Sequence, residues 1–196
     1  MRIHDLTGRN AMAELDGTTV AIVVTNYGIE QDELARPRDA VIEAGGTAVI
    51  VAIEDGEVTT LVGDKNPGQT FAVDQVIGDA DPDSFDALIL PGGTINADSL
   101  RLETAAIEFV ARIVEAKKPV AAICHGPWAL VEAGKVGGKT LTSYPSLRTD
   151  LLNAGASWVD ESVRVDDEGG WTLVTSRDPD DLDDFTRELV GAFSAA

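Results

Sequence analysis

The sequence predicts an α/β fold, a three-layer α/β/α sandwich built on a mostly parallel, doubly wound (flavodoxin-like) sheet. Short runs rich in Val, Ile and Ala alternate with longer segments of helical spacing, a pattern typical of strands joined by crossover helices. The strand runs are apolar at every position, as expected for strands buried on both faces of a parallel sheet. A chain of 196 residues is long enough to build one domain with its own core.

The N-terminal half contains three of the predicted strands. β-Branched residues dominate the first two, and the third runs into a glycine turn. A segment rich in Gly, Asp and Thr precedes the third strand and indicates a β-hairpin or an irregular excursion. The elements are a strand (Thr18–Val24), a loop (Thr25–Ile29), a helix (Glu30–Ala44), a strand (Thr47–Ile53), the excursion (Glu54–Phe85) and a strand with its turn (Asp86–Gly93).

The C-terminal half continues the alternation and ends in a hairpin and a helix. An apolar face that includes Leu100, Leu102 and Val110 predicts a long first helix. Asp178 as N-cap and Pro179 as first helical residue favour the start of the last one. The elements are a helix (Asp98–Lys117), a strand (Pro119–Ile123), a helix (Pro127–Ala133), a strand (Lys139–Ser143), a short helix (Leu147–Ala154), a hairpin (Ser162–Ser176) and a closing helix (Pro179–Phe193).

Domain organisation is simple, since neither an internal repeat nor a linker is found. We expect a polar N-terminal tail over residues 1–17 and a single domain over 18–196. The tail has no apolar signal core, and no uncharged apolar run approaches the roughly 20 residues that span a bilayer. One cysteine allows no internal disulfide, and a thiol that must stay reduced predicts a cytoplasmic protein.

The charge balance is strongly acidic, with 34 acidic against 15 basic residues and a net charge of −19. Such a surface repels phosphate groups, and no cluster of Lys and Arg forms a local exception. The sequence therefore predicts neither nucleic-acid nor membrane partners. The acidity fits a device for solubility or an adaptation to high salt, and both interpretations stay open.

Ligand sites of doubly wound sheets lie at the loops beyond the carboxyl ends of the strands. Three predicted loops qualify: Thr25–Glu33, Pro91–Asp98 and Cys124–Trp128. The third, in "PVAAICHGPW", holds the only cysteine and one of only two histidines. These loops are the candidates for a functional site.

The residues around Cys124 fit a sharp strand-to-helix turn. Ala122 and Gly126 are small, and Pro127 suits the first helical position. The pattern resembles the nucleophile elbow of hydrolases with cysteine in place of serine. A thiol at a helix N-terminus is expected to have a lowered pKa. A buried, inert cysteine is the alternative, and the local sequence leaves both interpretations open.

Longer stretches resemble the ThiJ/PfpI family of the class I glutamine amidotransferase-like fold. They are "AAICHGPWAL", "GIEQDELARP", "DALILPGGTINADSLR" and "LVTSRDPDDLDDFTRELV", which together run from about Thr18 to Phe193. The resemblance is nearest to PfpI-type members, which are described as intracellular cysteine peptidases and general stress proteins. It implies that Cys124 is the nucleophile and that His125 assists it.

The resemblance also implies roles for two acids in the first helix. Glu33 matches the acid that hydrogen-bonds the thiol, and Glu30 matches a second acid of the same pocket. A charged carboxylate would raise the thiol pKa, so Glu33 is expected to be protonated, with a raised pKa, while Cys124 has a lowered one. A solvated pair at the helix start is the alternative for both acids.

Further implied site residues lie in the two other loops. The amides of Gly92 and Gly93, with that of His125, would form an oxyanion site. Asp98 falls near the acid that reaches the histidine of a neighbouring subunit, which implies a homodimer or higher homo-oligomer. Trp128 can wall the pocket, although packing is the simpler interpretation.

Several other site classes lack the residues they need. A glutamine amidotransferase triad requires a histidine far downstream of the cysteine, whereas this chain has only His4 and His125. One cysteine and two histidines make no closed zinc set, and "LPGGTIN" lacks dinucleotide-binding spacing. We therefore expect neither a metal nor a cofactor.

Two functional classes remain. The first is implied by the resemblance, since family members are described as glyoxalases, deglycases and peptidases: a stress-related cysteine enzyme acting on reactive carbonyls, with peptidase activity less favoured. Its expected substrate is a small carbonyl compound or a modified protein. The second is a redox-sensing stress protein or holdase in which Cys124 is oxidised rather than catalytic.

Overall fold

The computed structural model describes residues 14–195. Its centre is a seven-stranded sheet in the order β11-β12-β8-β7-β1-β3-β6, in which only the β11–β12 pair is antiparallel. The strands of this sheet are β1 (Thr19–Val23), β3 (Thr47–Ala52), β6 (Gln75–Val76), β7 (Ala87–Leu90), β8 (Val120–Ile123), β11 (Val163–Asp166) and β12 (Leu173–Ser176). The predicted mostly parallel, doubly wound sheet is confirmed.

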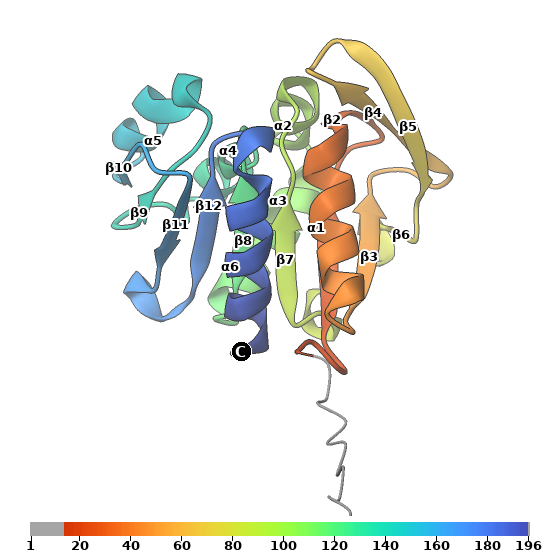
Figure 1. The fold of residues 1–196 in the computed structure, drawn as a ribbon, viewed down its shortest axis with the longest axis horizontal. Coiled ribbons are helices and arrows are strands. Elements are labelled where there is room, and N and C mark those ends of the chain that lie inside the picture. Colours follow the sequence, from red (N-terminus) through yellow and green to blue (C-terminus); the bar gives the residue numbers. More distant parts are fainter. Residues whose placement is uncertain (1–13, 196) are drawn as a thin grey trace, which may run out of the picture.

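Helices cover both faces of the sheet and complete three layers (Figure 1). Helices α1 (Gln31–Glu43) and α6 (Leu182–Ser194) pack against each other on one face. Helices α3 (Thr104–Glu115) and α4 (Pro127–Glu132) lie on the other. A further helix, α5 (Arg148–Asn153), flanks the sheet beyond β12.

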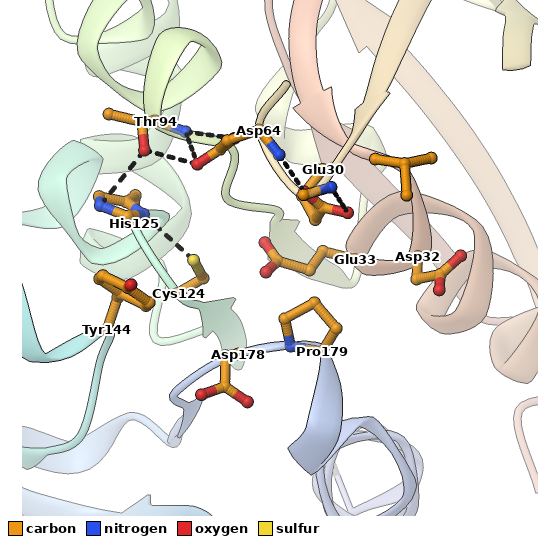
Figure 2. Close-up of a pocket in the computed structure, with 12 residues that line it drawn as sticks. Glu30, Asp32, Glu33, Asp64, Thr94, Cys124, His125, Tyr144, Asp178 and Pro179 are labelled. Carbon is orange, nitrogen blue, oxygen red and sulfur yellow. Dashed lines mark hydrogen bonds between the residues drawn. The ribbon is translucent and has the colours of Figure 1, made fainter. Parts of the chain in front are cut away.

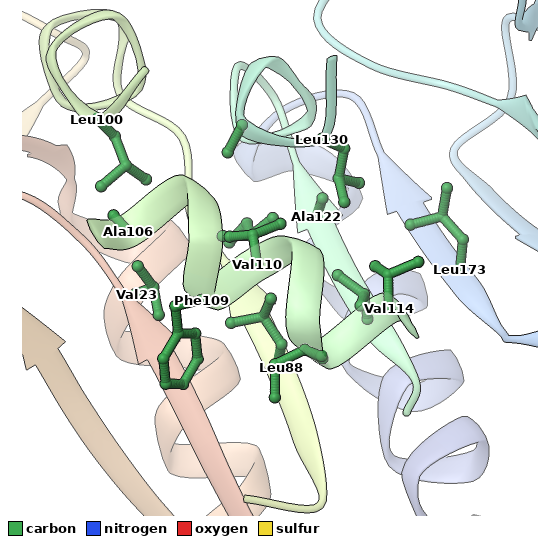
Figure 3. Close-up of a cluster of buried hydrophobic side chains, with 14 of the residues drawn as sticks. Val23, Leu88, Leu100, Ala106, Phe109, Val110, Val114, Ala122, Leu130 and Leu173 are labelled. Carbon is green, nitrogen blue, oxygen red and sulfur yellow. The ribbon is translucent and has the colours of Figure 1, made fainter. Parts of the chain in front are cut away.

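Two hydrophobic clusters fill the space between the sheet and the helical layers. On the α3 face, Phe109 and Val110 of α3 pack onto Leu88 and Ala122 of the central strands (Figure 3). The opposite cluster joins Leu34 of α1 and Phe185 of α6 to the other side of the same strands. The central strands β1, β7 and β8 contribute to both clusters, which is why their sequences are almost entirely apolar.

The excursion between β3 and β7 contains the β-hairpin that the sequence allowed. Strands β4 (Glu57–Val62) and β5 (Asn66–Ala72) pair antiparallel around a turn at residues 63–65. Strand β2 (Tyr27–Glu30), where a loop was expected, pairs parallel with β4 and completes a small three-stranded sheet. The pairing partner lies some 30 residues away, so local sequence did not indicate this strand.

The helix expected over Asp98–Lys117 is in fact two helices, α2 (Thr94–Leu100) and α3. Leu100 is buried, but Leu102, which was counted on the same apolar face, is 82% exposed between the helices. The break lets α2 lie at the carboxyl edge of the sheet while α3 runs along its face. The single-helix prediction was wrong because the apolar residues before and after Leu102 pack as two separate helices that run in different directions.

Two smaller differences concern the short strand β9 (Thr140–Leu141) and the start of the folded region. The strand expected over Lys139–Ser143 is only β9, which pairs with β10 (Ser157–Trp158) outside the main sheet. Leu15, placed in the polar tail, is fully buried, so the folded region begins before Thr18. Residues 1–13 of that tail, His4 included, lie outside the described residues. Within residues 14–195, no helix is long and apolar enough to cross a membrane.

Candidate active site

Cys124 lies at the tight turn between β8 and α4, as the elbow pattern predicted. Its φ of 60° is in the left-handed region, which a non-glycine residue adopts only when its surroundings enforce it. The enforcing bonds are 3.0 Å long: the Cys124 amide donates to the Ser176 carbonyl, and the Tyr144 amide donates to the Cys124 carbonyl. The turn thereby aims the sulfur into a pocket at the carboxyl edge of the sheet.

This pocket has a volume of about 500 Å³ and an acidic wall (Figure 2). Among residues 14–195, five carboxyl groups line it, and neither a lysine nor an arginine does. Its other lining residues are two from the β4–β5 hairpin, one from α2, the elbow pair, Tyr144 and a proline. The lining comprises Glu30, Asp32, Glu33, Val62, Gly63, Asp64, Thr94, Cys124, His125, Tyr144, Asp178 and Pro179.

Glu33 is fully buried beside the sulfur. Its Oε2 accepts a hydrogen bond of 2.8 Å from the Gly92 amide. Burial raises the pKa of Glu33 to about 8, against the opposing effects of the Cys124 side chain and the Gly92 amide. The carboxyl group is therefore protonated at neutral pH, as expected, and it can donate that proton to an acceptor in the pocket.

The thiol does not have the lowered pKa that the sequence suggested. Burial raises the pKa of Cys124, a charge on Glu33 would raise it further, and the Gly93 amide lowers it. Helix α4 has only six residues, so its dipole offers little compensation. Cys124 and Glu33 titrate as a coupled pair, and the resting sulfur carries its proton.

His125 lies against this thiol and is itself almost fully buried. Cys124 Sγ is 3.1 Å from His125 Nδ1. The imidazole stacks on the Tyr144 ring at a centroid distance of 4.8 Å, and the Trp128 ring lies 5.2 Å from it at a tilt. Burial lowers the pKa of His125, which Asp64 opposes, so the ring is neutral at pH 7 and able to accept a proton.

Glu30 lines the same pocket, as the resemblance implied, and it also holds the neighbouring turn. Its carboxylate accepts bonds of 3.0 Å and 2.9 Å from the amides of Gly63 and Asp64, and so holds the β4–β5 turn over the pocket. Asp64 in turn binds Thr94 at the start of α2. Sequence reasoning missed Asp64 and Thr94; the only available signal was the turn sequence "VGDKNPG" inside the excursion.

The backbone amides of the two glycines in the turn after β7 have different roles. The Gly92 amide binds Glu33, so it is not available to an oxyanion. The Gly93 amide faces the sulfur, and with the amide of His125 it remains a candidate for that role. The expectation for Gly92 was therefore wrong, because the buried carboxyl group takes its donor.

Asp98 and Trp128 lie near the pocket without lining it. Asp98 is exposed on α2 and does not reach His125 of its own chain. Trp128 donates from Nε1 to Asp150 Oδ2 at 2.9 Å and packs behind the His125 ring, so it supports the histidine rather than walling the pocket.

Sequence relatives span nearly the whole domain. YraA of Bacillus subtilis, named as a candidate cysteine protease, is 43% identical over 87% of this chain and 95% of its own. General stress protein 18 of the same organism is 40% identical, with coverage of 89% and 96%. A deglycase of Pyrococcus abyssi is 40% identical, with coverage of 86% and 96%.

Solved structures and a family model agree with these relatives. DJ-1 of Schizosaccharomyces pombe superposes with a TM-score of 0.75 at 21% identity, covering 89% of this chain and 90% of its own. A two-domain protein of Anabaena variabilis with DJ-1/ThiJ/PfpI-like and ferritin-like domains has a TM-score of 0.80 at 31% identity; the match covers 89% of this chain and 47% of that one. The model of the DJ-1/PfpI family matches residues 18–192, and this chain belongs to that family.

Proposed function

We propose that this protein is a cysteine-dependent enzyme that converts small reactive carbonyl compounds, by glyoxalase- or deglycase-type chemistry. The observation that carries the proposal is Cys124 Sγ, 3.1 Å from the neutral base His125 Nδ1 and beside the protonated Glu33 carboxyl. A nucleophile, a base and a proton donor thus meet in one pocket. Relatives named as a deglycase and as a stress protein are consistent with this activity.

The reaction begins with attack of Cys124 Sγ on an aldehyde carbon. The S–H proton passes to His125 Nδ1 as the C–S bond forms, and the carbonyl π electrons move to oxygen, which Glu33 can protonate. With methylglyoxal, the former aldehyde hydrogen leaves as a proton and is returned to the adjacent carbon, while the hydroxyl proton of the hemithioacetal passes to the oxygen on that carbon. These two proton transfers give a lactoyl thioester. Water hydrolyses this thioester to lactate and restores the thiol. The sum is methylglyoxal plus water to lactate, with no oxidant or reductant.

The raised thiol pKa favours this enzyme over a redox sensor. A sensor cysteine reacts with peroxide as a resting thiolate that solvent can reach. Cys124 is only 5% exposed, and burial keeps its proton in place. In an enzyme, the adjacent base removes the thiol proton as the sulfur attacks the substrate. A nucleophile with a raised pKa can therefore act in catalysis without a resting thiolate.

The size of the pocket favours small substrates, and its charge disfavours anionic ones. A volume of about 500 Å³ is suited to a small molecule. The acidic lining repels a carboxylate, whereas it admits a neutral dicarbonyl or a cationic adduct on a side chain. Among carbonyl compounds we therefore expect methylglyoxal to be preferred over glyoxylate.

The activity is tested by measuring lactate formed from methylglyoxal. We expect turnover in the unmodified protein and its loss in Cys124→Ser, with Ser99→Ala, on the exposed side of α2, retaining it. Absence of turnover together with a stable sulfinate at Cys124 after peroxide treatment would favour the sensor function instead. Peptide cleavage that survives Cys124→Ser would be assigned to a contaminant.

Selectivity is tested by comparing kcat/KM for methylglyoxal and glyoxylate at two salt concentrations. Glyoxylate should react less efficiently, and added salt should narrow the difference, since screening weakens repulsion by the pocket carboxylates. Equal kcat/KM values at low salt would contradict the charge argument while leaving the thiol chemistry intact.

We propose further that the protein acts in the cytoplasm, where the Cys124 thiol stays reduced, and as a homo-oligomer. Asp98 is exposed on α2 beside the pocket, where it is free to meet a second copy of the chain. If a neighbouring Asp98 completes the site, specific activity should fall on dilution through the dissociation range, and Asp98→Asn should remove that dependence. A concentration-independent activity would contradict it.

A further inference from the structure

The groups beyond His125 form a chain of hydrogen bonds whose direction is set at Asp64 (Figure 2). Asp64 Oδ2 lies 2.6 Å from the Thr94 hydroxyl oxygen, and the Thr94 amide also donates to the Asp64 carboxylate at 3.0 and 3.2 Å. A carboxylate only accepts hydrogen bonds, and a hydroxyl has one proton. The Thr94 hydroxyl proton is therefore committed to Asp64.

This commitment determines where the His125 proton lies. Thr94 Oγ1 is 3.5 Å from His125 Nε2, and an oxygen whose proton is already donated can only accept there. Ser146 Oγ, 3.3 Å from the same nitrogen, can accept as well. Ser146 can also donate, but an unprotonated Nε2 would set its lone pair against that of the Thr94 oxygen. The Thr94 contact therefore favours a proton on Nε2, and Nδ1 then presents its lone pair to the thiol 3.1 Å away.

The position of Asp64 is itself enforced. It adopts a φ of 55°, in the left-handed region that aspartate enters more readily than most residues with a Cβ, as suits a hairpin turn. Glu30 holds it there by accepting the amides of Gly63 and Asp64 at 3.0 and 2.9 Å. The turn held by the nearly buried Glu30 carboxylate places the Asp64 side chain against α2, so the contact with Thr94 is held at both ends rather than being an isolated surface contact.

We infer that Asp64 is a positioning residue of the site: acting through Thr94, it fixes His125 in the Nε2–H tautomer and stabilises the imidazolium formed when Nδ1 takes the Cys124 proton. Only that proton moves, from Sγ to Nδ1, and the negative charge of Asp64 compensates the positive ring. This inference rests on the proposed function for its role in turnover, but it concerns the thiol and the imidazole alone. It supplies His125 with a carboxylate from its own chain, independently of Asp98.

The tautomer is tested by ¹⁵N NMR of the histidine side chains at pH 7. A His4→Gln variant assigns the second histidine, which lies outside the described residues. We expect His125 to show a protonated Nε2 and an unprotonated Nδ1. Asp64→Asn lets the new amide donate to Thr94 and frees the Thr94 proton for Nε2, so the population should shift toward the Nδ1–H tautomer. A protonated Nδ1 in the unmodified protein would overturn the inference.

Thiol reactivity provides the second readout, as the rate of Cys124 alkylation by iodoacetamide from pH 6 to 10. We expect Asp64→Asn and Thr94→Val to slow alkylation at pH 7 about tenfold, equivalent to roughly one pKa unit. Thr94→Ser, which keeps the hydroxyl, should alkylate within about twofold of the unmodified rate, less than 1 kcal/mol. Asp55→Asn, which removes a charge from the exposed turn after β3, is the matched control and should leave the rate unchanged.

Folding of each variant is checked by circular dichroism, and Thr94→Ser distinguishes loss of the hydroxyl from damage to the turn. Unchanged alkylation rates in both Asp64→Asn and Thr94→Val would overturn the inference. Alkylation needs no carbonyl substrate. Failure of the proposed function therefore appears as missing lactate with the alkylation effects intact, whereas failure of the present inference appears as lactate formation that Asp64→Asn and Thr94→Val leave unaffected.

Discussion

At the residue scale, Glu33 holds an uncharged carboxyl group between the Gly92 amide and the Cys124 sulfur. Burial raises its pKa to about 8, far above the ordinary 4.5. Its Oε1 has no hydrogen-bond partner among the described residues. The site thus keeps a protonated carboxyl group available, and burying this polar group lowers the stability of the fold.

The pH dependence of stability follows from this pKa. A carboxyl group that is more easily protonated in the folded state stabilises the fold fully below about pH 4.5, and this contribution is lost as the pH rises to about 8. We expect Glu33→Gln to increase the free energy of unfolding relative to the unmodified protein, by an amount that grows from pH 5 to pH 8 and reaches a few kcal/mol. Urea unfolding at both pH values measures it.

The matched control is Glu43→Gln, at the exposed end of the same helix. Its effect on unfolding should be small and nearly constant over this pH range. A Glu33→Gln effect that is equal at pH 5 and pH 8 would mean that the folded-state pKa of Glu33 is ordinary.

Cys124, His125 and Glu33 could be predicted from sequence because short motifs carry them. Asp64 and Thr94 could not, since no motif links a hairpin turn to the start of α2. The protonation of the thiol was also predicted wrongly, because a helix dipole is apparent from sequence whereas desolvation is not.

At the scale of elements, the turn between β7 and α2 brings backbone unusually close to the site. A Cβ added at Gly92 would lie 2.8 Å from the Cys124 Cβ and 2.9 Å from the His125 amide nitrogen, closer than real Cβ contacts. Gly93 adopts a φ of 83° against the backbone of β2. Glycine is needed here so that amides can face the thiol and the carboxyl group.

We expect Gly92→Ala to slow iodoacetamide alkylation of Cys124 at least about tenfold, because the added methyl group displaces the Glu33 carboxyl and the elbow. Gly191→Ala is the control. Gly191 lies in α6 with open space around its Cα, so alanine should stabilise the protein by about 0.5–1 kcal/mol. The alkylation rate and thermal unfolding report the two effects. Normal alkylation in Gly92→Ala would show that the turn has room for a side chain.

Local patterns predicted the main strands and most helices correctly, but they failed where an element depends on a distant partner. Strand β2 exists because β4 pairs with it, and its four residues alone looked like loop. The break between α2 and α3 exposes Leu102, which helical periodicity had assigned to the buried face.

At the scale of the whole molecule, one buried lysine joins elements from different parts of the chain. Lys139 Nζ forms a 3.1 Å ion pair with Asp166 and donates to the carbonyls of Trp171, at 2.7 Å, and Glu168. It also lies 4.1 Å from the centre of the Trp171 ring. This cation fastens the β11–β12 hairpin at the edge of the main sheet to the segment that leads into β9.

We expect Lys139→Met to reduce the free energy of unfolding by about 3–5 kcal/mol, because it leaves the Asp166 carboxylate buried without its partner. Lys135→Met removes an exposed ion pair with Glu115 and should change it by less than about 1 kcal/mol. Urea denaturation measures both. Equal small changes would indicate that water reaches Asp166 and replaces the ammonium.

The sequence by itself determined the fold class, the family resemblance and the elbow around Cys124, because apolar periodicity and turn residues act over a few positions. Only the tertiary structure decided which donors and acceptors meet in the pocket. It assigned the Gly92 amide to Glu33, directed Glu30 to the hairpin turn, and placed Asp64 behind His125 through Thr94. The physical reason is that protonation and hydrogen-bond direction depend on burial and on neighbours from distant segments, which no local pattern records.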